Sequence, residues 1–313
     1  MNTIDPANRR LLDARLIYYV LFGIAAAAVG LLPWLITGLT LPLQNLWNVD
    51  TLPADMPRTL LPFSQYALTL IVGLIVVGSA IAGGIARTKR ETQPRLAPVA
   101  LIVGVLAVQI AATIQTATVV SEGVGQSSAS QLYLALLVAV TIVAIAVGLL
   151  VFLLIARSRV PGAAIAVSLA AVALGPWVAG LALPLNSLGT EANFTALSIV
   201  RWIPAVVVGL AMAWSGFTSL GRAVASFTAL LALWIGPSLF TAISAAAGTR
   251  VLASRPAEMA EYGAQVFQSV LRTSESLSPL VLALVVMAVA LGIGWMLRRR
   301  TPSSRDDVSS SFV

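Results

Sequence analysis

The sequence contains no cysteine and no histidine in its 313 residues. Without cysteine the chain can form no disulfide, has no thiol nucleophile, and cannot carry a lipid attached through a cysteine. Without histidine it has no histidine-based metal site and no Ser-His-Asp triad. We therefore expect no metal and no other cofactor, and the residue types give no positive indication of an enzyme.

Charge is also scarce. Charged residues make up 10% of the chain, whereas hydrophobic residues make up 58%, and the mean hydropathy is +0.94. A water-soluble surface needs far more charge than this. The bilayer core offers the backbone no hydrogen-bond partner, so each apolar run of ~20 residues must cross it as a helix. The sequence predicts an all-α polytopic integral membrane protein.

Eight apolar runs are long enough to span a bilayer. We place them at residues 16–39, 62–86, 96–120, 131–156, 162–183, 197–217, 224–246 and 280–297. Basic residues divide unequally between the two sides that these spans define. One side holds 14 of the 19 Lys and Arg residues, including Arg9, Arg10, Lys89, Arg157 and Arg299. Because cytoplasmic segments carry the excess of Lys and Arg, we expect a plasma-membrane protein with both termini in the cytoplasm.

One phrase occurs twice in the chain. "PWLITGLTLPL" begins at Pro33, and "PWVAGLALPL" begins at Pro176. Shorter echoes follow in the same order: "IVGLIVVGS" matches "VVGLAMAWS", and "IAATIQT" matches "IGPSLFT". Each half would hold four spans, an even number, so both halves would enter the membrane from the same side. We predict two parallel four-helix repeats, at residues 1–160 and 161–300.

The repeated phrase has two interpretations. Its members are Pro33, Trp34 and Pro42 in the first copy and Pro176, Trp177 and Pro184 in the second. In the first interpretation each copy is a helix stop with an aromatic anchor, because Trp favours the headgroup boundary and the residue before Pro leaves the helical region. In the second, the two copies are symmetry-related caps that line an outward-facing cavity.

The segment between the last two spans predicts a further helix. Met259, Tyr262, Val266 and Phe267 recur at helical spacing, and Pro256 suits a helix start. We expect an external amphipathic helix over about 256–272, which either lies on the membrane surface or acts as a lid or docking element. Residues 301–313 are polar and rich in serine, which predicts a disordered cytoplasmic tail.

No Asp, Glu, Lys or Arg lies deep inside a predicted span. Such a residue would be the usual sign of an ion pump or a proton-coupled carrier, so its absence argues against both and against carboxylate-based catalysis in the membrane. The polar residues that remain form a stripe on the third span, Gln109, Thr113 and Thr116, and the seventh span aligns with it through Ser238 and Thr241. Pro237 follows Gly236 there, and we expect this pair to break the seventh helix.

The stripe could hold helices together through hydrogen bonds, or it could line a solute path between the two repeats. In either case we expect the third and seventh spans to face each other or a shared cavity. For function, the sequence leaves two classes open. One is a non-enzymatic, permease-like protein that handles a lipid or small solute. The other is a scaffold or accessory subunit of a membrane or cell-envelope complex. Both imply membrane lipids as partners, the second adds other membrane proteins, and nothing indicates nucleic-acid binding.

Overall fold

The computed structural model describes residues 6–44, 46–185, 187–249 and 255–300. This part of the chain is helical, apart from connecting segments and isolated bridges. The elements are α1 (Pro6–Leu35), the 3₁₀ turn η1 (Pro53–Asp55), α2 (Leu68–Thr88), α3 (Ala97–Gly123), α4 (Ser128–Arg157), α5 (Val160–Ala182), α6 (Glu191–Val200), α7 (Ile203–Ser215), α8 (Leu220–Gly248), α9 (Pro256–Arg272) and α10 (Ser274–Arg300).

Eight helical segments in the described residues are long and apolar enough to cross a membrane. They coincide with the eight runs predicted from hydropathy, and the architecture is that of a multi-pass membrane protein. The sixth segment consists of two helices, α6 and α7, with a break at Arg201 and Trp202. Pro204 lies in the first turn of α7, a position that suits a residue without an N–H and favours the restart of the helix there.

The first helix group comprises α1 to α4. Within it α1 packs on α2 and α3, and α4 packs on α2 and α3. Small residues allow the backbones to approach closely. A Cβ atom on Gly23 of α1 would lie 2.2 Å from the Leu101 carbonyl oxygen of α3, and one on Gly30 would lie 2.7 Å from the Gly78 Cα of α2. Glycine is therefore required at both crossings.

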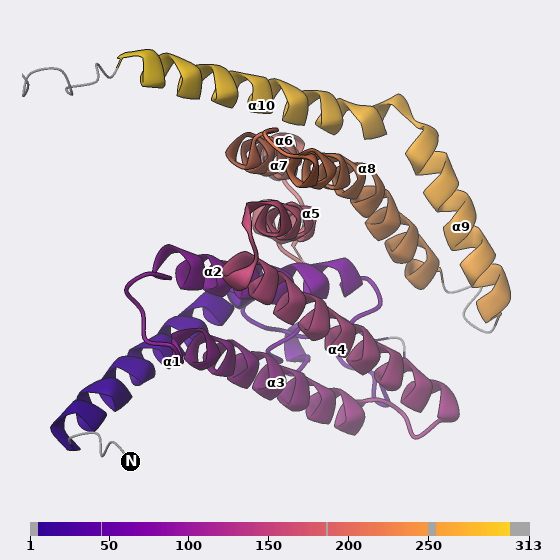
Figure 1. The fold of residues 1–313 in the computed structure, drawn as a ribbon. Coiled ribbons are helices and arrows are strands. Elements are labelled where there is room, and N and C mark those ends of the chain that lie inside the picture. Colours follow the sequence, from indigo (N-terminus) through magenta and orange to yellow (C-terminus); the bar gives the residue numbers. More distant parts are fainter. Residues whose placement is uncertain (1–5, 45, 186, 250–254, 301–313) are drawn as a thin grey trace, which may run out of the picture.

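The second helix group comprises α5, α7, α8 and α10, with α6 and α9 attached. Here α5 packs on α7 and α8, and α10 packs on the same two helices. In each group, therefore, the first and the fourth long helix both pack on the second and the third. Figure 1 shows α5 between the first group and the remaining helices of the second, with α10 on the far side. The side of α10 that does not contact α7 or α8 is exposed and includes Val281, Val289 and Ile293.

The two groups meet through α5, which also packs on α2 and α4. A Cβ atom on Gly73 of α2 would lie 2.9 Å from the Ala173 carbonyl oxygen of α5, so the two backbones are nearly in contact there. A small apolar core that includes Val76, Val151 and Ala170 fills the space between α2, α4 and α5. At the far end of these helices the Arg87 guanidinium donates to the Ile155 and Ser158 carbonyls and lies 4.9 Å from the Trp214 ring centre.

The segment between α1 and α2 folds back into the first group. Gly38 and Leu39 both have positive φ, at 81° and 64°, and turn the chain inward. The Thr59 amide then donates to the Leu39 carbonyl. Leu41, Leu61 and Phe63 are at most 1% exposed, so both ends of this segment belong to the core, whereas Val49 and Leu52 in its middle are exposed.

Two features of the second group concern expectations from the sequence. The break expected at Gly236–Pro237 is wrong, because α8 runs continuously from Leu220 to Gly248 with Pro237 inside it. Helix α9 occupies the range expected for the amphipathic helix and packs along α8, where a Cβ atom on Gly263 would lie 3.2 Å from the Ala246 Cβ. The predicted tail, 301–313, lies outside the described residues.

Candidate functional site

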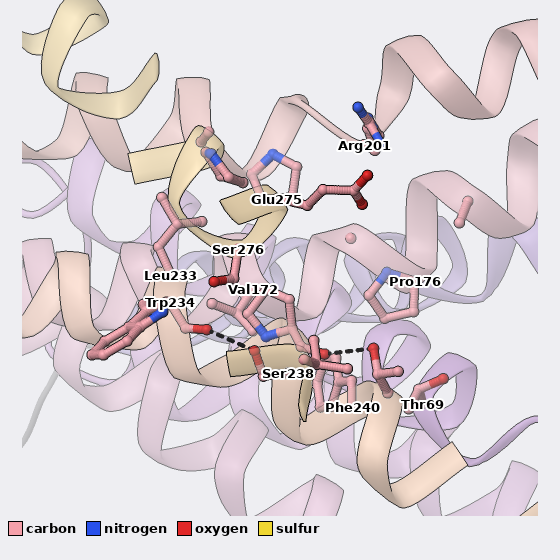
Figure 2. A pocket seen from close by; sticks show the side chains of 18 of the residues that line it. Thr69, Val172, Pro176, Arg201, Leu233, Trp234, Ser238, Phe240, Glu275 and Ser276 are labelled. Atoms are coloured by element: carbon pink, nitrogen blue, oxygen red, sulfur yellow. Dashed lines mark hydrogen bonds between the residues drawn. The ribbon is translucent and has the colours of Figure 1, made fainter. Parts of the chain in front are cut away.

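The main cavity of the structure lies inside the second helix group and has a volume of about 830 Å³. Its walls come from α5, the α6–α7 junction, α8 and the start of α10, and one residue, Thr69, comes from the first group. The lining is mainly apolar, with Val172, Leu233 and Phe240 among the side chains drawn in Figure 2. This volume is in the range of small-molecule sites, about 300–1,000 Å³.

Four of the residues singled out in the sequence line this cavity: Pro176 of α5, and Pro237, Ser238 and Thr241 of α8. The Ser238 hydroxyl donates to the Trp234 carbonyl at 3.1 Å, and the Thr241 hydroxyl donates to the Pro237 carbonyl at 3.0 Å. Figure 2 shows both bonds as dashed lines. Each donor is thus satisfied by its own helix, while each hydroxyl oxygen can still accept a bond from a bound molecule.

Charge occurs in the cavity lining at two residues, Arg201 and Glu275. Figure 2 shows both on the same side of the cavity. The Arg201 guanidinium lies 4.7 Å from the ring centre of Trp202, an arrangement typical of cation–π contact. Both side chains are exposed, and no ion pair joins them, although both belong to the described part. Their charges are therefore open to a bound molecule.

Trp234 also lines the cavity, from α8. Its indole Nε1 is buried and has no hydrogen-bond partner among the described residues. A buried donor without a partner is costly, so such groups normally find one. This nitrogen presents almost no accessible surface to the cavity, so the cavity reaches other parts of the Trp234 side chain and not its N–H.

The other three stripe residues, Gln109, Thr113 and Thr116, are buried inside the first group. The Gln109 side-chain amide donates to the Ile75 carbonyl at 3.0 Å and to the Ser79 hydroxyl at 3.1 Å, and so joins α3 to α2. The Thr113 hydroxyl donates to the Gln109 carbonyl of its own helix. None of these side chains faces lipid.

Thr116 has a different partner, the α1–α2 segment. Its hydroxyl accepts a bond from the Leu61 amide at 3.0 Å, and the neighbouring Gln115 side chain accepts from the Leu60 amide at 2.9 Å. Gln115 also donates to the Arg58 carbonyl. The end of the stripe therefore binds an extended piece of backbone. One signal of this buried segment is present in the sequence, the apolar run "TLLPF" at residues 59–63.

The structure does not bring the two sets of stripe residues together. Helix α3 packs on α1, α2 and α4, whereas α8 packs chiefly on α5, α7, α9 and α10. The third and seventh spans do not face each other, and no residue of α3 lines the main cavity. The expectation that these spans face each other or a shared cavity is wrong for the main cavity, because α2 and α5 lie between α3 and α8.

The repeated phrase lies at corresponding helix ends, but its two tryptophans differ in their partners. Trp34 is 0% exposed and donates from Nε1 to the Thr59 carbonyl at 2.7 Å, so its ring faces the protein interior. Trp177 is partly buried and donates to the Gly30 carbonyl of α1 at 2.7 Å. Pro176 lines the main cavity, whereas Pro33 packs near Gly180 of α5.

The remaining prolines of the phrase act through their carbonyl oxygens. Pro42 accepts a bond from the Gln44 side-chain amide, which also donates to the Phe63 carbonyl, and Tyr133 donates to Gln44 at 2.6 Å. Pro184 accepts bonds from the Ser187 amide and hydroxyl. Both prolines therefore stabilise the chain where it leaves a helix.

A second hollow, of about 560 Å³, lies in the first group between α1 and the connection from α2 to α3. Arg15, Tyr18 and Lys89 are among its lining residues. Within the described residues no group of three or more Asp or Glu side chains could hold a metal ion. Comparison with protein-family models, with curated proteins and with solved structures finds no match to this chain.

Proposed function

We propose that this chain is a non-enzymatic, permease-like membrane protein that binds a lipid or a small amphipathic solute in the main cavity. The observation that carries the proposal is the composition of that cavity. The cavity has the volume of a small-molecule site. Its lining is mainly apolar and includes the neutral hydroxyls of Ser238 and Thr241. Two charged residues, Arg201 and Glu275, also line it. Apolar walls with a few placed polar groups are typical of ligand sites.

We further propose that the chain arose from two parallel copies of a four-helix unit, with both termini on the cytoplasmic side of a plasma membrane. The repeated phrase supports the duplication, and so does the agreement of the helix pairs that pack in each group. The excess of basic residues on one side supports the orientation. In this orientation the main cavity opens toward the outside.

We place the solute site within the second group, and not along the contact between the groups. Gly73 of α2 lies almost against the Ala173 backbone of α5, and the core around Val76 fills the adjoining space. A solute could pass there only if the two groups separated. The cavity needs no such movement to accept a ligand.

Co-purification tests this proposal. Gly175 lines the cavity, and a Cβ atom there would meet only the Pro204 ring, at 3.6 Å, so Gly175→Leu should fill space without a clash. On α10, a Cβ on Gly292 has nothing within 4 Å, so Gly292→Leu is the matched control. Native mass spectrometry of protein from native membranes should find a bound small molecule in the wild type and in Gly292→Leu, and less of it in Gly175→Leu. Equal amounts in all three would contradict the proposal.

A second candidate is a scaffold or accessory subunit of a membrane or cell-envelope complex. The observation that favours it is α10, which contacts its own chain along one side and leaves Val281, Val285, Val289 and Ile293 at least half exposed. A partner helix could cover this face. Recovery of one membrane protein in constant ratio with the chain, lost when Val285 and Val289 are replaced by Trp, would favour this candidate.

A further inference from the structure

We propose that the main cavity binds a zwitterionic aminophospholipid, with one acyl chain extended between α5 and α8 and the head between Arg201 and Glu275. This inference rests on the proposed function, and it names the ligand class. If the two groups are copies of one unit, the cavity beside Thr241 has a counterpart in the first group, beside Thr116. The echo "IAATIQT" and "IGPSLFT" pairs Thr116 with Thr241 and Thr113 with Ser238.

In the first group this space is already filled. Residues 58–63 of the α1–α2 segment pass beside Thr116 in an extended course, and Leu61 and Phe63 are at most 1% exposed. In the second group the segment before α7 is the helix α6, which has no buried residue. Helix α6 packs on α5 and contributes Leu197 and Val200 to the cavity wall, but it inserts no residue into the space beside Thr241, which stays open. The first group thus carries its own occupant, an extended apolar chain, and the second group has room for one.

The lining of the second space favours an acyl chain over a peptide. In the first group Gln115 accepts from the Leu60 amide and donates to the Arg58 carbonyl, which matches a peptide backbone. At the position of Gln115 the second group has Phe240, which can make neither bond. The two peptide groups served by Gln115 would be left unpaired against Phe240. An acyl chain has no such groups, so it leaves none of them unpaired beside Phe240.

The two charges of the cavity specify the head. A phosphate beside Arg201 is the pairing that a guanidinium favours. Glu275 lies on the same side and is not paired with Arg201, so a head with an anion alone would meet a like charge there. A head that adds a primary ammonium gives Glu275 a donor. The aminophospholipid satisfies both groups.

Photolabelling in defined vesicles tests the proposal. The full-length protein is reconstituted in phosphatidylcholine vesicles that contain a trace of phosphatidylethanolamine or of phosphatidylglycerol, each with a diazirine in the acyl chain, and labelled residues are mapped by mass spectrometry. Phosphatidylethanolamine should label the α5 and α8 walls more strongly than phosphatidylglycerol does. The expected difference is roughly two- to five-fold, because exposed charge pairs are modest in strength. Gly175→Leu should reduce this labelling, and Gly292→Leu should not.

The head groups are tested separately. Glu275→Gln should lower labelling by phosphatidylethanolamine and leave phosphatidylglycerol unchanged or raised, and Arg201→Gln should lower both. Equal labelling by the two lipids, still sensitive to Gly175→Leu, would overturn the head assignment while the proposed function stands. Cavity labelling by a diazirine-bearing hexapeptide with the sequence of residues 58–63, with none by either lipid, would overturn the lipid in favour of a peptide. If neither lipid labels the cavity but a solute co-purifies and is lost in Gly175→Leu, the aminophospholipid is the wrong ligand and the proposed function still stands.

Discussion

The Trp177 indole nitrogen lies 2.7 Å from the Gly30 carbonyl oxygen and donates a hydrogen bond to it. The bond joins α5, the first helix of the second group, to α1, the first helix of the first group. It forms beside the tight approach of Gly180 to Pro33, where a Cβ would lie 3.3 Å from the Pro33 Cβ. One tryptophan of the repeated phrase therefore fixes the two groups to each other, while the other, Trp34, fixes the α1–α2 segment within the first group.

Replacing Trp177 by Phe should loosen this contact. The change keeps an aromatic ring and removes the donor, and hydrogen bonds between membrane helices contribute about 0.6 kcal/mol each, up to about 1.7 kcal/mol. We expect a lower midpoint of thermal unfolding in detergent. Phe227→Leu is the control, because it shortens an aromatic side chain that is 64% exposed on α8. An equal effect of the two substitutions would show that the bond does not stabilise the contact.

Gly73 and Gly84 of α2 give a matched test of the contact between the groups. A Cβ on Gly73 would meet the Ala173 carbonyl oxygen at 2.9 Å, whereas one on Gly84 would meet nothing within 4 Å. Gly73→Val should therefore push α2 and α5 apart and destabilise the fold by about 1–3 kcal/mol, the usual range for overpacking. Gly84→Val should be close to neutral. Thermal unfolding and gel filtration in detergent measure both, and a neutral Gly73→Val would contradict the close approach.

The eight spans could be predicted from the sequence because each is a continuous apolar run, and the bilayer leaves such a run no choice but the helix. The division of the sixth span could not. The apolar run continues past Arg201 and Trp202, and the boundary becomes visible only in the structure, where Pro204 occupies the first turn of α7. At Pro237 the sequence predicted a helix break that the structure does not have. This proline lacks an N–H, yet α8 continues through it, packed on α5 at Gly236.

The site was predictable only in part. Polar side chains at helical spacing identified Ser238 and Thr241 as residues of interest, because polar groups are rare within apolar spans. Their separation from Gln109 and Thr116 depends on which helices pack, and no local pattern carries that. The inward course of residues 58–63 was also missed, since it depends on bonds to Gln115 and Thr116, some 55 positions further along the chain.

Orientation can be tested because the chain has no native cysteine. Ser269 is exposed on α9, and we predict that this helix lies outside the cell. In intact cells an impermeant thiol reagent should label Ser269→Cys and should not label Ser303→Cys in the C-terminal tail. Permeabilised cells, in which both should react, provide the control. The reverse pattern would place the basic side outside, against the usual distribution of Lys and Arg.

Thr113 and Thr116 separate the two roles of the stripe, since both are buried threonines on one helix face. Thr116 accepts from the Leu61 amide, whereas Thr113 bonds only to the Gln109 carbonyl of its own helix. Thr116→Val would leave the Leu61 N–H buried without a partner, at a cost of about 1–3 kcal/mol, so residues 58–63 should leave the bundle more often. Thr113→Val deprives no other segment of a partner.

Ser64→Cys, at a position only 2% exposed, reports the opening of the segment through the rate at which the cysteine reacts with a thiol reagent. We expect Thr116→Val to raise that rate several-fold and Thr113→Val to leave it unchanged. Equal rates in the two variants would mean that the segment is retained by its apolar side chains, Leu61 and Phe63, without help from the hydroxyl.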